Sequence, residues 1–64
     1  MDTKGFVRFT SVYDDDIYVQ SNAVVALLEV KHKKETFTNL LLFYGYKVSV
    51  RETVDQVMYK LLNN

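Results

Sequence analysis

The C-terminal segment of this 64-residue chain is patterned as a short amphipathic helix, and this pattern constrains the fold most. Thr53 and Gln56 match a capping box, in which each side chain accepts a hydrogen bond from the backbone amide of the other residue. The apolar residues that follow at helical spacing are Val54, Val57, Met58, Leu61 and Leu62. Because so short a helix is marginal in isolation, we expect this apolar stripe to pack on a sheet.

Upstream of the helix, several runs of residues have the composition of β-strands. They are rich in aromatic and β-branched residues, or they alternate between apolar and polar positions. The predicted strands are residues 6–13, 17–20, 24–31, 37–43 and 47–50. The run Leu40–Leu42 is apolar at every position, which favours a central strand covered on both faces. Residues 24–31 have a second interpretation, because Ser21 and Asn22 could cap a short helix running through Glu29.

Polar segments separate these runs and indicate the turns. Asp14–Asp16 interrupts the first run, because adjacent carboxylates repel each other and aspartate favours turns. Residues 32–35 are polar, and Gly45 supplies the positive φ that a tight hairpin needs. In an up-and-down meander, the acidic turn Asp14–Asp16 and the basic turn Lys31–Lys34 lie at one end of the sheet, and Gly45 lies at the other.

The pattern as a whole predicts an α+β fold. We expect a small antiparallel β-meander of about five strands, packed by one C-terminal amphipathic helix. Residues 5–64 are predicted to form a single small domain, and residues 1–4 to be disordered.

A domain of this size buries too little apolar surface to be very stable without a disulfide, a metal or self-association. The chain has no cysteine, and His32 is its only histidine. A disulfide is therefore excluded, and we expect no metal or cofactor. We interpret Asp14–Asp16 as a solvated turn, because no glycine-punctuated loop of the kind that binds Ca²⁺ follows it. Self-association remains, and we expect a homo-oligomer.

The charge and hydropathy of the chain limit the kinds of partner and the cellular location that we expect. Eight basic residues balance eight acidic ones, which argues against a protein that works by wrapping nucleic acid. The longest apolar run, residues 40–44, is far shorter than the roughly 20 residues of a membrane span. Residues 1–5 lack the apolar core of a signal peptide. We therefore expect a cytoplasmic protein without a membrane span.

The sequence contains no nucleophile–base pattern, glycine-rich phosphate loop or metal-ligand spacing, so we do not expect an enzyme. Tyrosine is enriched in protein interfaces because its ring buries area while its hydroxyl finds a partner. The candidate interface residues are Tyr13, Tyr18, Tyr44, Tyr46, Lys31, Lys33 and Lys34. We predict a small non-enzymatic interaction module that self-associates and docks on a protein partner. The alternative is a small regulator that contacts nucleic acid through the basic turn Lys31–Lys34.

A weak motif runs from Asn22 to the final helix, over about two thirds of the chain. It consists of an asparagine followed by an apolar strand with an acidic residue, a second apolar strand ending at an Xaa-Gly turn, and the passage V-x-E-[ST]-x-x-x-V. The matching residues are Asn22, Val25, Leu28, Glu29, Tyr44, Gly45, Val50, Glu52, Thr53 and Val57. This pattern resembles the small FlbD-like proteins associated with bacterial flagella and swarming. Residues 33–36 replace the Pro-Asp-Thr turn of that family. The resemblance implies no catalytic residues, and we expect a protein of bacterial or phage origin.

Overall fold

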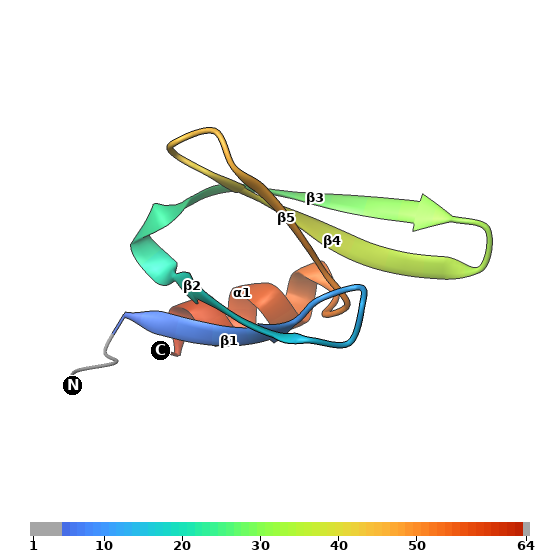
Figure 1. Ribbon diagram of the computed structural model, residues 1–64, viewed down its shortest axis with the longest axis horizontal. Helices are drawn as coiled ribbons and strands as arrows, with labels where there is room; N and C mark the ends of the chain where they lie inside the picture. The colour runs from blue at the N-terminus through green and yellow to red at the C-terminus, as the bar shows by residue number, and fades with distance from the viewer. Residues whose placement is uncertain (1–4, 64) are drawn as a thin grey trace.

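The computed structural model describes residues 5–63, and the predicted disorder of residues 1–4 lies outside them. The elements are β1 (Phe6–Thr10), β2 (Asp16–Gln20), the 3-10 turn η1 (Ser21–Ala23), β3 (Val24–His32), β4 (Glu35–Leu42), β5 (Lys47–Val50) and α1 (Val54–Leu62). Figure 1 shows their arrangement. The predicted α+β class, with five antiparallel strands and one C-terminal helix, is confirmed. The strand interpretation of residues 24–31 is also confirmed, because β3 occupies them.

The strands form two sheets, because the meander is interrupted between β2 and β3. β1 and β2 form a two-stranded ribbon, and β3, β4 and β5 form a second sheet with β4 in the centre. The turn η1 redirects the chain between them, and its Ser21 amide donates to the carbonyl of Gly5 at 2.7 Å. The two sheets meet where Ser11 forms an isolated bridge with Val50. Strand propensity predicted each of these elements but not which neighbour each strand would pair with.

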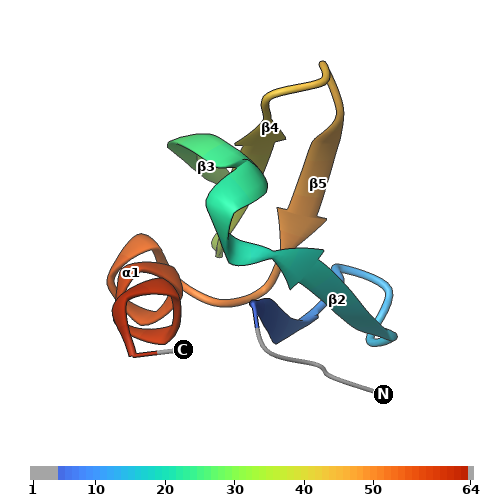
Figure 2. The same cartoon turned by 90° about the vertical axis from the view of Figure 1, so that its left-hand side faces the viewer.

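The core lies between the two sheets and the helix. Val7 and Phe9 point inward from β1, and they alternate with the exposed Phe6 and Arg8. The other buried apolar residues are Val19, Ala23, Leu40, Leu42, Val50 and Val57. Figure 2 shows α1 and the β1–β2 ribbon on the same side of the three-stranded sheet. The core is therefore built on one face of that sheet.

The opposite face of the three-stranded sheet has no helix or second sheet of the described chain packed on it (Figure 2), and near Phe37 it borders Val12 and Tyr13 of the β1–β2 turn. Phe37 and Leu41 alternate with the buried residues of β4 and are only partly buried. Their neighbours on this face include Ala26, Leu28 and Val30 of β3, and Leu28 is about half exposed. The predicted central position of β4 is confirmed, but the predicted cover on both faces is wrong, because both the helix and the ribbon pack on the same side. We call residues Ala26, Leu28, Val30, Phe37 and Leu41 the open face.

The helix begins as predicted. The Gln56 amide donates to Thr53 Oγ1 at 3.1 Å, and the Thr53 amide donates to Gln56 Oε1 at 3.0 Å, which completes the capping box. Val57 is fully buried. The prediction that the whole stripe packs on the sheet is wrong for Met58 and Leu62, which are exposed. The two narrow sheets contact only part of the apolar surface of the helix.

The β4–β5 turn has the geometry that its glycine predicts. Gly45 has φ 92°, and its amide donates to the Leu42 carbonyl at 2.9 Å. The Leu42 amide donates to the Tyr46 carbonyl at 2.8 Å, which closes the hairpin. The other two hairpin turns reach positive φ without glycine, at Asp14 (70°) and Lys33 (58°). Aspartate tolerates this region comparatively well, whereas nothing in the side chain of lysine favours it.

Val57→Ala should lower the free energy of unfolding by about 2 kcal/mol, because two buried methyl groups are lost and the space is only partly refilled. Leu62→Ala is the matched control on the same helix, since Leu62 is 80% exposed. Its effect should stay below about 0.5 kcal/mol. Chemical denaturation of both variants measures the difference. Equal losses would contradict the packing of α1 through Val57.

Candidate functional site

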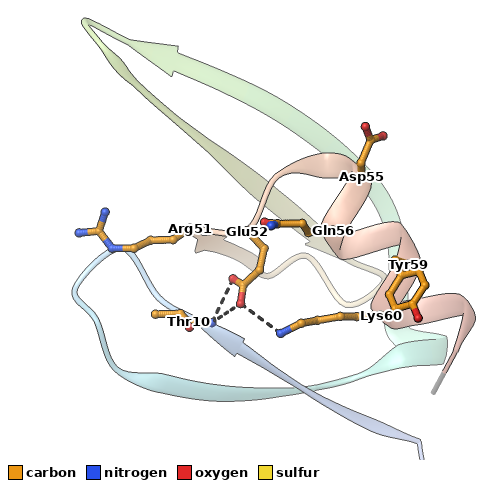
Figure 3. A pocket seen from close by; sticks show the side chains of 7 residues that line it. All are labelled: Thr10, Arg51, Glu52, Asp55, Gln56, Tyr59 and Lys60. Atoms are coloured by element: carbon orange, nitrogen blue, oxygen red, sulfur yellow. Dashed lines mark hydrogen bonds and ion pairs between the residues drawn. The ribbon is translucent and has the colours of Figure 1, made fainter.

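An open depression of about 600 Å³ lies where β5 leads into α1. It is lined by Thr10, Arg51, Glu52, Asp55, Gln56, Tyr59 and Lys60 (Figure 3). The depression lies between the end of β1 and α1. Its lining contains carboxylates, a lysine and a tyrosine, so its geometry decides whether these groups are available for chemistry.

The carboxylate of Glu52 lies at the centre of this hollow. Both of its oxygens accept from the Thr10 amide at 3.1 Å, and Oε2 accepts from Lys60 Nζ at 3.2 Å. Lys60 Nζ also donates to the Arg8 carbonyl at 2.9 Å. On the other side, the backbone carbonyl of Glu52 accepts from Thr38 Oγ1 at 2.7 Å. One residue therefore connects β1, β4 and α1.

The pKa of Glu52 lies below its ordinary value as the net result of opposing effects. Burial raises the pKa, because only 12% of the side chain is exposed. Hydrogen bonds from the backbone amide of Thr10 and from its own backbone lower it. The hydrogen bond and charge of Lys60 lower it further. Together the lowering effects exceed the effect of burial, so the carboxylate is held in its ionised form.

These contacts account for the polar groups at the centre of the hollow. Glu52 and Lys60 satisfy each other and the backbone of β1, and the Lys60 ammonium lies 5.3 Å from the Phe9 ring centroid. The network joins elements far apart in sequence, which is a structural role. Sequence reasoning included Glu52 in the family motif but assigned it no contact, because its partners Thr10 and Lys60 are brought to it only by the fold.

Arg51 connects the two charged turns. Its Nε lies 2.8 Å from Asp14 Oδ1, and its Nη2 donates to the Val12 carbonyl at 2.8 Å. Its Nη1 lies 3.9 Å from Glu35 Oε1. The acidic and basic turns are therefore at the same end of the molecule, as predicted, and Figure 1 shows the β4–β5 turn at the other end. The sequence did not single out Arg51.

A second, smaller hollow of about 300 Å³ lies beside Arg51. Its lining residues are Val12, Tyr13, His32, Glu35, Thr36, Phe37, Ser49 and Arg51. His32 reaches this hollow from the end of β3, and Tyr13 reaches it from the β1–β2 turn. The hollow shows that these two turns enclose a common space.

All seven predicted interface residues are exposed, but they do not form one surface. Tyr13 lies beside the acidic turn, and Tyr18 lies on the outward side of β2. Lys31, Lys33 and Lys34 lie at the far tip of the β3–β4 hairpin. Tyr44 and Tyr46 lie at the opposite end, in the β4–β5 turn. Of the predicted tyrosines, these two make a ring contact with each other.

Phe43, Tyr44 and Tyr46 form what we call the aromatic hairpin. Tyr44 meets Phe43 edge-on with ring centroids 5.0 Å apart, and it meets Tyr46 edge-on at 5.6 Å. The three residues are between 57% and 68% exposed, so these mutual contacts leave most of their surface in water. Sequence reasoning missed Phe43, because it stood at the end of a predicted strand instead of in the turn.

Comparisons of the chain with protein-family models, with curated proteins and with solved structures returned no significant match. Within residues 5–63, no three or more histidine, aspartate or glutamate side chains are grouped so as to hold a metal ion. None of the helices in this range is long and apolar enough to cross a membrane.

Glu52→Gln should lower the free energy of unfolding at neutral pH by about 2 kcal/mol, because the Thr10 amide and Lys60 lose a charged acceptor. The pKa of Glu52 is lower in the folded state, so its contribution is present above the pKa of an unfolded glutamate, about 4.3. The contribution is lost as the pH falls through the lower folded pKa. Denaturation of both proteins between about pH 7 and pH 2 should therefore show the two stabilities converging.

Glu35→Gln is the control for this experiment. It makes the same chemical change at an exposed carboxylate whose closest contact to Arg51 is 3.9 Å. Its effect should stay below about 0.5 kcal/mol across the same range. If Glu52→Gln behaved like the control, the carboxylate would not be holding β1 to the helix.

Proposed function

We propose that this chain is a small non-enzymatic interaction module that self-associates and docks on a protein partner. The observation that supports this proposal best is the aromatic hairpin, where three large rings gather at one end of the molecule and remain mostly in water. Exposed apolar patches on small proteins mark interaction sites, and aromatic residues supply most of the binding energy at such sites. The cytoplasmic location and the relationship to FlbD-like proteins remain predictions.

The aromatic hairpin is held in position before any partner binds. The hydrogen bonds between Leu42 and the turn residues Gly45 and Tyr46 fix its backbone, and Tyr44 packs edge-on between the two other rings. Rigid aromatic side chains lose little conformational entropy on binding. The partner that fits is a protein surface with an apolar pocket rimmed by acceptors for the tyrosine hydroxyls.

Self-association is supported by the open face of the three-stranded sheet. The open face carries apolar side chains from two neighbouring strands, and Leu28 at its middle is about half exposed. A second copy beside these residues would bury part of this apolar surface and add to a small core. This is the remaining route to stability for a chain without cysteine.

A nucleic-acid regulator is the alternative, and one observation favours it. Lys31, Lys33 and Lys34 are all exposed at the tip of a projecting hairpin. The carboxylate of Glu35, which follows Lys34 in the chain, and the zero net charge reduce the attraction of that tip for phosphate. Retention on heparin or DNA that falls steeply with salt would support the alternative, and an absence of retention would exclude it.

The double variant Tyr44→Ser with Tyr46→Ser should abolish docking while the chain stays folded. The partner is captured by cross-linking in the native host and measured by quantitative mass spectrometry. Proteins enriched on the wild-type chain should fall by about tenfold or more on the double variant, because the rings that fill the pocket are gone.

Tyr59→Ser is the control for the docking experiment, since Tyr59 is an exposed tyrosine on α1, outside the aromatic hairpin. It should capture the same proteins as the wild-type chain. Circular dichroism confirms that each variant is folded. Capture that is the same for the wild-type chain and the double variant would overturn the assignment of the aromatic hairpin.

A further inference from the structure

β3 has an outer edge that no described segment pairs with. It is the terminal strand of the three-stranded sheet and spans nine residues. Figure 1 shows that its second half, with the facing part of β4, extends along the molecule beyond α1 and the β1–β2 ribbon. A long strand with unpaired amides and carbonyls is a template for pairing with another chain.

The backbone groups that point outward from this edge follow from the ladder of β4. The amide and the carbonyl of Leu42 both bond within the β4–β5 hairpin, so the backbone polar groups of Leu42 point toward β5. Because the backbone groups of successive residues point to opposite sides along a strand, the amides and carbonyls of the odd-numbered residues of β4 point toward β3. Their partners there are Ala26, Leu28, Val30 and His32. The amides and carbonyls of Leu27, Glu29 and Lys31 consequently point away from the sheet.

The charges on β3 select one register for a second copy. In an antiparallel pair that continues the sheet, directly opposite residues share a face, so the two-fold axis passes midway between a residue and its own copy, and we call this an axis through that residue. An axis through Glu29 or Lys31 sets like charges opposite each other, which is destabilising. An axis through Leu28 sets Glu29 opposite Leu27. An axis through Val30 sets each Glu29 opposite Lys31 of the second copy.

The same register fits the shape of the molecule. About Val30, residues 28–32 of one copy pair with residues 28–32 of the other. These residues belong to the half of β3 that projects beyond the helix, so α1 of one copy is clear of the other. Leu28 and Val30 of both copies then lie side by side on one continuous open face.

We propose that a second copy of this chain pairs antiparallel with the outer edge of β3 about a two-fold axis through Val30. The two sheets join into one sheet of six strands, with a Glu29–Lys31 pair on each side of the axis. This inference rests on the proposed self-association and assigns the contact between the two copies to the outer edge of β3. The amides of Glu29 and Lys31, which meet solvent in the single chain, become hydrogen-bonded across the axis.

Charge reversal tests the proposed register. Glu29→Lys alone and Lys31→Glu alone each create two like-charge pairs across the axis, so each should raise the dimer Kd by about tenfold or more. An equimolar mixture of the two variants should form a heterodimer, because every opposite pair is again lysine with glutamate. Sedimentation equilibrium should place the Kd of this mixture within about threefold of the wild-type value.

Lys47→Glu is the control, because it makes the same charge change as Lys31→Glu at an exposed residue of β5, the strand on the opposite edge of the sheet. It should leave the Kd unchanged. A wild-type chain that stays monomeric at every concentration would overturn the proposed self-association itself. A dimer that forms but responds to none of the β3 variants would overturn the β3 edge and leave the self-association standing.

Amide hydrogen exchange supplies an independent measurement on the wild-type chain. The amides of Glu29 and Lys31 should exchange rapidly in dilute solution and become protected as the dimer forms. If the protection of these two amides stays unchanged while the mass of the particle doubles, the two copies meet at another surface.

Discussion

The carboxylate of Glu52 is the contact on which the rest of the architecture depends. The chain leaves β5 after Val50, and the Arg51 amide still bonds to the Thr10 carbonyl at 2.8 Å. At the next residue the Glu52 side chain replaces the backbone as the partner of the Thr10 amide. Lys60 then brings the helix to the same carboxylate. The ribbon, the three-stranded sheet and the helix are joined within three residues of chain.

The local elements could be predicted from the sequence, because their causes are local. The capping box of Thr53 and Gln56 needs only neighbouring residues, and the positive φ of Gly45 needs only a glycine in a tight turn. The pairing of strands could not be predicted, since β2 and β3 are adjacent in sequence but belong to different sheets. The exposure of Leu62 depends on how far the sheets extend beneath the helix, which the helical pattern does not contain.

The candidate surfaces were only partly predictable for the same reason. Exposed tyrosines could be expected from composition, and those in the β4–β5 turn do meet. Phe43 joins them because β4 ends at Leu42, one residue before the end of the predicted strand. The open face follows from packing the ribbon and the helix on one side, and the free edge of β3 follows from the break between β2 and β3. The contact at Glu52 joins the ribbon to the helix, which lie on the same side of the three-stranded sheet (Figure 2).

The most direct test of this account is the exchange rate of the Thr10 amide compared with that of Leu40, measured by NMR at neutral pH. Leu40 is fully buried in the central strand, so its amide exchanges when the chain unfolds globally. If Glu52 joins the ribbon to the rest, the protection of Thr10 should lie within about tenfold of that of Leu40. Exchange at Thr10 that is faster by orders of magnitude would show that the ribbon opens on its own, and that the carboxylate does not hold the fold together.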